Sequence, residues 1–140
     1  MKAGKYDILG SLDGRKLHDE AMPNPGPGEV LVRMRAASLN VRDVMIAEAR
    51  YAVPGKVGVI ALSDGAGDIA ECGPGVTRFK TGDRVTATYF PQWKDGRLDF
   101  QMGFDQYGCT RDGAATEYAV YHQDALVSIP EHLSYEEGAT

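Results

Sequence analysis

The chain consists of short segments in which apolar and polar residues alternate, separated by glycines and prolines. The clearest segment covers residues 29–37 (EVLVRMRAA), where Val30, Val32 and Met34 fall on one face and arginines on the other. Similar alternation occurs at residues 83–90 and 117–130, the latter interrupted by a His-Gln-Asp turn. With seventeen glycines and seven prolines between such segments, the pattern predicts a mainly β domain of at least five strands.

Residues 61–70 (ALSDGAGDIA) match the G-x-G-x-x-A spacing of a dinucleotide-binding fingerprint at Gly65, Gly67 and Ala70. Such a fingerprint binds a pyrophosphate only where its last position opens a helix. A Gly-Pro-Gly sequence follows shortly after Ala70 and would break that helix within about two turns. We therefore predict a short strand over residues 68–72 rather than a cofactor cradle.

Two segments depart from the β pattern and begin with helix-capping residues. In residues 40–51, Val41, Val44 and Met45 follow helical spacing, Asn40 is a candidate N-cap, and Asp43 stands where a capping-box acid would.

A capping box of Ser134 and Glu137 predicts the start of a second helix, but the chain ends three residues later. Since an isolated helix nucleus is unfavourable, we expect this chain to be a piece of a longer protein.

The composition favours a single folded domain and argues against nucleic-acid-binding and membrane proteins. The 140 residues, 43% hydrophobic and 25% charged, are typical of one folded domain, and a net charge of −5 argues against a nucleic-acid partner. No apolar stretch reaches the roughly 20 residues of a membrane span, and the N-terminus lacks a signal-peptide core, so we expect a cytoplasmic protein with no membrane partner. Cys72 and Cys109 are expected to be reduced thiols.

The motifs PGPGEVLVRM, SLNVRD, SDGAG and GVTRFKTGDRV together resemble the medium-chain dehydrogenase/reductase family over essentially the whole chain. The resemblance implies that residues 1–133 form the GroES-like domain, a partly open β-barrel with short helices on the substrate side of the active-site cleft. Residues 134–140 would begin the connection to a Rossmann domain that binds NAD or NADP, in a protein that forms a homodimer. The glycines of SDGAG would then allow close approach between strands.

The resemblance also bears on zinc. Zinc-dependent members have Cys, His and Glu at the positions that match Asn40, Ser63 and Asp64, and a catalytic zinc needs about three protein ligands. Many also carry four cysteines in the segment that matches residues 91–113, called the lobe below, where this chain has only Cys109. We therefore expect no metal at either position.

Asp43 matches an acid that orients the zinc-binding His of those relatives. In this chain it is either a helix cap or part of the substrate-binding site.

SLN-x-RD together with SDGAG most resembles the zinc-free branch, which includes quinone reductases. Without a metal, a substrate carbonyl is polarised by hydrogen-bond donors, and the candidates are Asn40, Arg42 and Ser63. Asn40 is also expected on the nicotinamide side of the site and Asp64 among the substrate-binding residues. Asn40, Ser63 and Asp64 are expected to face one shared cleft, with Arg42 near its rim. The alternatives are that Asn40 only caps its helix, Arg42 is solvated, and Ser63 and Asp64 only serve turns.

Aromatic residues supply candidate walls for a substrate pocket, or else belong to the core; they are Tyr51, Tyr89, Phe90 and Trp93. The lobe is longer than a connection requires, and is a substrate lid, a partner surface or a mobile insertion.

Our leading hypothesis is the substrate-side domain of a zinc-independent NAD(P)(H)-dependent oxidoreductase that acts on a carbonyl, quinone or activated alkene, inactive without its cofactor-binding domain. One alternative is a zinc-dependent alcohol dehydrogenase. Another is a co-chaperonin-like assembly module, although residues 20–28 (EAMPNPGPG) lack the hydrophobic triplet of such proteins.

Overall fold

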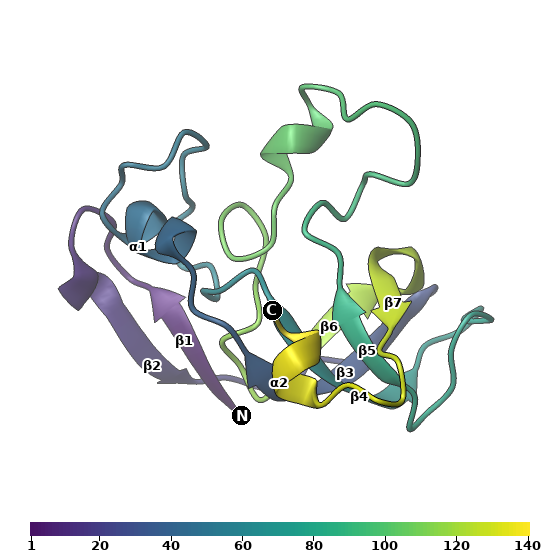
Figure 1. The fold of residues 1–140 in the computed structure, drawn as a ribbon. Coiled ribbons are helices and arrows are strands. Elements are labelled where there is room, and N and C mark those ends of the chain that lie inside the picture. Colours follow the sequence, from purple (N-terminus) through teal and green to yellow (C-terminus); the bar gives the residue numbers. More distant parts are fainter.

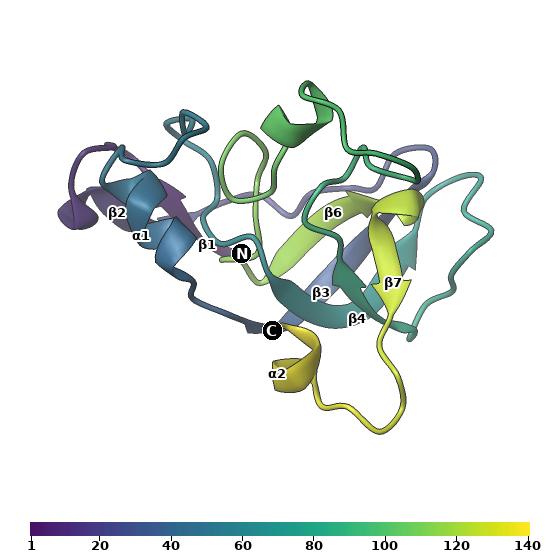
Figure 2. The same ribbon diagram turned by 45° about the horizontal axis from the view of Figure 1, so that its top comes forward.

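The structure is a computed structural model that describes all of residues 1–140. Its centre is an antiparallel five-stranded sheet in the order β6-β3-β4-β5-β7, which curls into a half-barrel (Figures 1 and 2). The strands are β3 (Glu29–Ala37), β4 (Gly65–Cys72), β5 (Arg84–Ala87), β6 (Tyr118–His122) and β7 (Leu126–Ser128). The predicted mainly β fold class, a partly open barrel with short helices, is confirmed.

A separate hairpin of β1 (Lys2–Tyr6) and β2 (Arg15–Asp19) lies beside the half-barrel (Figure 1). Isolated bridges from Ala3 to Thr116 and from Lys5 to Ile60 join β1 to the rest of the molecule. The sequence analysis missed this hairpin, because β2 is exposed along most of its length and carries no apolar alternation.

The main hydrophobic core fills the inside of the curled sheet. Its members come from all five strands and the segments beside them: Val30, Val32, Ile69, Val85, Tyr107, Ala119, Tyr121, Ala125 and Leu126. The face predicted for Val30 and Val32 is therefore buried, while Arg33 and Arg35 are exposed. Leu31 is buried as well, at 6% exposure, so β3 is covered on both faces at this point.

The glycine-rich stretch lies inside strand β4, which begins at Gly65, three residues earlier than predicted. A Cβ atom on Gly67 would lie 2.2 Å from the carbonyl oxygen of Arg33, and one on Gly65 would lie 2.5 Å from Met34 Cε. Both glycines thus serve close packing against the neighbouring strand β3. No helix follows them, as predicted.

Both predicted helix starts are confirmed, at α1 (Val41–Ala47) and α2 (Tyr135–Gly138). Three short 3-10 helices complete the fold: η1 (Leu12–Gly14), η2 (Met102–Phe104) and η3 (Gln123–Ala125).

The apolar residues at helical spacing do not form the buried face of α1. Val41 is 78% exposed, and the buried residues are Asp43, Ile46 and Ala47. The reason is that a two-turn helix contacts the molecule mainly through its last turn, where Ile46 and Ala47 join a small core that includes Tyr6.

Helix α2 packs on β3 and β4 (Figure 1). The guanidinium of Arg84 stacks on the Tyr135 ring at 4.6 Å, and the Tyr135 hydroxyl donates to Asp68 at 3.4 Å.

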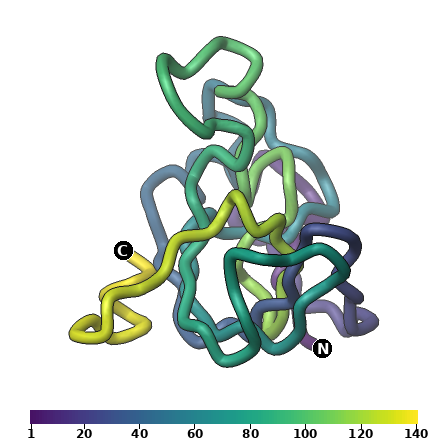
Figure 3. The backbone as a smooth tube through the Cα atoms, turned by 90° about the vertical axis from the view of Figure 1, so that its right-hand side faces the viewer, coloured from purple at the N-terminus to yellow at the C-terminus, as the bar shows by residue number.

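The lobe projects from the sheet as a long loop (Figure 3). No helix of the chain has the length and apolar character of a membrane span.

Candidate functional site

Asn40 and Asp64 meet between the start of α1 and the start of β4. The Asn40 amide nitrogen donates to Asp64 Oδ2 at 2.6 Å and to Ser38 Oγ at 3.2 Å. The Asp64 carbonyl oxygen accepts the Ser38 N–H at 3.1 Å. Both amide hydrogens of Asn40 are therefore engaged, and its orientation is fixed by side chains outside its own helix.

Ser63 precedes Asp64 and is only 2% exposed, yet its hydroxyl has no hydrogen-bond partner. Leu62, the residue before it, has φ +67°, a left-handed conformation that is unusual for leucine. Such strain and such an unpaired polar group each cost free energy, and strained backbone clusters at functional sites.

Asp43 is almost completely buried, at 1% exposure. Its Oδ2 accepts the backbone N–H of Asn40 at 2.9 Å, which is the predicted capping interaction. Oδ1 has no hydrogen-bond partner and lies 3.6 Å from Arg42 Nη1. Burial raises the pKa of Asp43, and the cap hydrogen bond and Arg42 offset this only in part.

Arg42 is the central cation of the region, and its side chain is only 11% exposed. The alternative of a solvated residue is therefore wrong. Its Nη2 donates to Gln106 Oε1 at 3.0 Å and to the Tyr107 carbonyl at 2.9 Å. Its guanidinium carbon lies 5.3 Å and 4.8 Å from the ring centroids of Tyr51 and Tyr89. Nε and Nη1 are buried without a hydrogen-bond partner.

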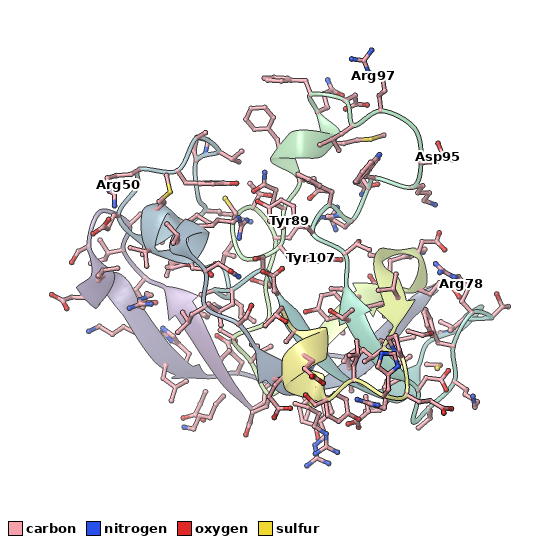
Figure 4. All side chains as sticks on the ribbon, viewed as in Figure 1. Arg50, Arg78, Tyr89, Asp95, Arg97 and Tyr107 are labelled. Carbon is pink, nitrogen blue, oxygen red and sulfur yellow. The ribbon has the colours of Figure 1, made fainter.

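Two of the four predicted aromatic residues form the walls around Arg42. The hydroxyls of Tyr51 and Tyr89 are 2.8 Å apart, and the Tyr89 hydroxyl donates to Gln106 Oε1 at 3.0 Å. Desolvation by burial raises the pKa of Tyr89. Figure 4 shows Tyr89 and Tyr107 between α1 and the five-stranded sheet.

The other two aromatic residues lie farther out. Phe90 packs edge-on against Tyr89 with ring centroids 4.4 Å apart. Trp93 is 47% exposed and donates its indole N–H to Gly96 within the lobe. Trp93 therefore belongs to the lobe surface, where its ring lies edge-on to Phe90 with centroids 6.5 Å apart.

The structure thus forms two groups from the predicted residues. Asn40 and Asp64 are hydrogen-bonded in one, with Ser63 next to them in sequence. Arg42, Tyr51 and Tyr89 form the other, and Asp43 lies between the two because it contacts both Asn40 and Arg42. No hydrogen bond joins Ser63 to either group.

Sequence reasoning missed Gln106, which is 3% exposed and contacts both Arg42 and Tyr89. It is an isolated glutamine in a polar loop, and neither spacing nor neighbours distinguish it from exposed Gln101 in the same lobe.

A cavity of about 610 Å³ lies between the lobe and β6 and has a mainly polar lining. Tyr107 and Arg111 line it, whereas Asn40, Ser63 and Asp64 do not. A shared cleft for the predicted donors remains a prediction.

Comparison with known proteins agrees with this architecture. The family model of the alcohol dehydrogenase GroES-like domain matches residues 26–131. The chain belongs to this family. The resemblance to the medium-chain dehydrogenases/reductases is confirmed at this level.

Named relatives of the GroES-like domain include oxidoreductases. A zinc-type alcohol dehydrogenase-like protein of Schizosaccharomyces pombe is 40% identical over 96% of this chain and 39% of its own length. A quinone oxidoreductase of Pseudomonas aeruginosa is 34% identical over 96% of this chain and 35% of its own. A solved NAD-dependent alcohol dehydrogenase superimposes with a TM-score of 0.81 and 32% identity, over 99% of this chain and 42% of that one. The chain spans about two fifths of these proteins.

Zinc does not fit the residues of this GroES-like domain. At the first predicted position the donors are a carboxamide that already donates two hydrogen bonds, a hydroxyl and one carboxylate. No group of three or more His, Cys, Asp or Glu side chains is placed to hold a metal. In the lobe, Cys109 is a lone buried thiol 3.6 Å from the Val53 carbonyl, and burial raises its pKa, which disfavours the thiolate that zinc requires.

The phosphates of a nucleotide do not fit this domain either. The only fingerprint-like stretch is a β-strand whose glycines are occupied by close contact with β3.

Proposed function

We propose that this GroES-like domain is the substrate side of an NAD(P)(H)-dependent oxidoreductase that works without zinc and transfers hydride to or from a carbonyl, quinone or activated alkene. The observation that carries the proposal is the buried guanidinium of Arg42, whose Nε and Nη1 have no hydrogen-bond partner. A buried cation with unused donors suits a substrate oxygen on which negative charge develops. The names of the relatives support the reaction class.

The nicotinamide would supply or accept the hydride. This chain's residues would bind and polarise the substrate. Because both amide hydrogens of Asn40 are engaged, Arg42 and Ser63 are the proposed donors to the substrate oxygen. Low local dielectric around Arg42 strengthens each such contact.

Asn40 would shape the nicotinamide side of the site, Asp64 would contact the substrate, and Tyr51 and Tyr89 would form the substrate walls. Phe90 and Trp93 would extend these walls toward the lobe, and Asp43 would support Arg42 from the start of α1.

The relatives are longer than this chain, which leaves room for a nucleotide-binding domain in the complete enzyme. We propose residues 1–133 as the substrate-side domain, residues 134–140 as the start of the connection, and a homodimer as the assembly.

The test uses the complete enzyme with Ser63→Ala and Arg42→Lys. Loss of one donor to developing charge is expected to lower kcat by about 100-fold, with a smaller effect on KM. Ser63→Ala should leave the melting temperature unchanged or slightly raised, because the hydroxyl it removes is buried and unpaired.

Exposed Ser128 provides the control variant Ser128→Ala, which should keep full turnover. Unchanged kcat in both site variants would refute the role of the donors, and loss of activity on chelation of metals would refute zinc independence.

A further inference from the structure

Gln106 and Tyr107 are the lobe residues that bond Arg42, and Gln106 is the one that does so through its side chain. Its Oε1 accepts hydrogen bonds from Arg42 Nη2 and from the Tyr89 hydroxyl, both at 3.0 Å. Its Nε2 donates to the carbonyl of Gly103, and its backbone N–H donates to Thr110 Oγ1 at 2.9 Å. Both ends of the side-chain amide and the backbone N–H are therefore held.

The chemistry of the partners allows only one orientation of this amide. A guanidinium can only donate, so Oε1 faces Arg42, and a carbonyl can only accept, so the NH₂ group faces Gly103. The single hydrogen of the Tyr89 hydroxyl is then used on Oε1, and Tyr51 must donate to Tyr89. One directed chain of hydrogen bonds runs from Tyr51 through Tyr89 to Gln106.

The same contact fixes the rotation of the Arg42 guanidinium. Its Nη2 uses both hydrogens, one on Gln106 Oε1 and one on the Tyr107 carbonyl. The hydrogens of Nε and Nη1 are left without partners on the other edges of the group. Both anchors lie in the lobe, although Arg42 itself lies on α1.

We propose that Gln106 is a positioning residue, which rests on the proposed function of Arg42 above. By holding Nη2 and Tyr89 together, it directs the free donors of Arg42 at the substrate oxygen and makes the alignment of the site depend on the lobe. Without Gln106, Nη2 would keep only its bond to the Tyr107 carbonyl. The guanidinium could then turn about that single contact and lose the fixed geometry on which charge stabilisation depends.

The test compares three variants of the complete enzyme. Gln106→Leu removes all side-chain hydrogen bonds at similar volume. Gln106→Glu keeps an acceptor for Arg42 and Tyr89 but loses the donor to Gly103. Gln101→Leu is the matched control, because Gln101 is exposed in the same lobe.

Two readouts separate positioning from packing. The first is the ¹⁵N–¹H signal of Arg42 Nε, which should shift or broaden in Gln106→Leu and stay close to wild type in Gln106→Glu and Gln101→Leu. The second is kcat/KM, which should fall about 10–100-fold in Gln106→Leu, largely through kcat. Arg42→Leu is measured as a further variant. Adding Gln106→Leu to Arg42→Leu should lower kcat/KM little further.

Each other outcome overturns the proposal. An unchanged Arg42 signal in folded Gln106→Leu means that Gln106 does not hold the guanidinium, and an equal loss in the Glu variant means that it only packs against Gly103. If Gln106→Leu does not fold, the Glu variant decides between these results. Full turnover of Arg42→Leu would instead refute the proposed function, whatever the Arg42 signal shows.

Discussion

Arg42 and Asp43 are consecutive residues of opposite charge, and both are buried with part of their hydrogen-bonding capacity unused. They approach to 3.6 Å, which is an ion-pair contact but too long for a hydrogen bond. Removing charges from water is costly unless their partners are complete, so this pair lowers stability relative to a fully satisfied one. Such a cost is expected where a ligand completes the contacts.

The pKa of Asp43 gives a prediction about stability against pH. Because burial raises this pKa above its unfolded value, the folded state holds the proton more tightly, and stability falls as pH rises from the ordinary aspartate pKa through the folded one. Asp43→Asn keeps an oxygen acceptor for the Asn40 N–H and removes this titration. We expect the variant to be the more stable protein above that window, with the difference shrinking at acidic pH, as measured by urea unfolding across pH.

Asp124 provides a comparison with Asp43, because its pKa is shifted in the opposite direction. Hydrogen bonds from Lys94 and Arg78 lower its pKa, so its contribution is present above the unfolded pKa and is lost as pH falls through the folded one. Asp124→Asn should therefore lower the free energy of unfolding at neutral pH and make it depend less on pH in the acidic range. A neutral-pH loss of stability in Asp43→Asn as well would contradict the burial argument.

At the scale of the element, the glycine motif of strand β4 has two possible interpretations, a phosphate-binding turn or close packing between strands. Its glycine spacing suits a phosphate-binding turn, but the segment is extended and pairs with β3 on one side and β5 on the other. Close packing between backbones is then the reason for glycine.

Gly67→Ala is the substitution that tests this interpretation. Its Cβ would lie 2.2 Å from a backbone oxygen that is held in the sheet and cannot move freely, so we expect a loss of about 3 kcal/mol in the free energy of unfolding. Gly103→Ala is the control, since a Cβ there meets nothing within 4 Å. Calorimetric melting measures both, and equal stability of the two variants would show that β4 does not need glycine at position 67.

At the scale of the whole molecule, helix α1 is contacted by both the two-stranded hairpin and the lobe. The Tyr6 hydroxyl of β1 donates to the Asp43 carbonyl at 3.4 Å, and Arg42 donates to Gln106 and Tyr107 of the lobe. Three separate apolar clusters support the molecule, one inside the sheet, one under α1 and one between α2 and β4. Buried apolar side chains on every strand of the main sheet are sufficient reason to expect a cooperative unit.

We predict that the 140-residue chain folds by itself but binds neither NADH nor NADPH in the micromolar range. Folding follows from the closed core, and weak binding follows because no strand-to-helix turn presents free N–H groups to a pyrophosphate. Calorimetric titration of a monodisperse sample with NADH and with NADPH measures both affinities. Tight binding would reverse the interpretation of residues 65–70.

Local patterns in the sequence were enough for much of this molecule. Alternation located β3, β5, β6 and β7, and capping residues located the start of both α-helices, because strand faces and helix ends depend on residues a few positions apart. The Gly-Pro-Gly turn likewise excluded a helix after Ala70. The motifs of the family pointed to Asn40, Arg42, Ser63 and Asp64.

Features that depend on contacts between distant residues needed the folded structure. Main-chain pairing joins β2 to β1, and β2 is exposed along most of its length, so its side chains carry no apolar alternation. The buried face of α1 was chosen by its neighbours Tyr6 and Val53. Gln106 lies 64 residues from Arg42, and nothing in its local sequence distinguishes it from an exposed glutamine. A side chain accepts a hydrogen bond only when the fold places a donor beside it. A local sequence pattern contains no information about which distant residues come together in this way.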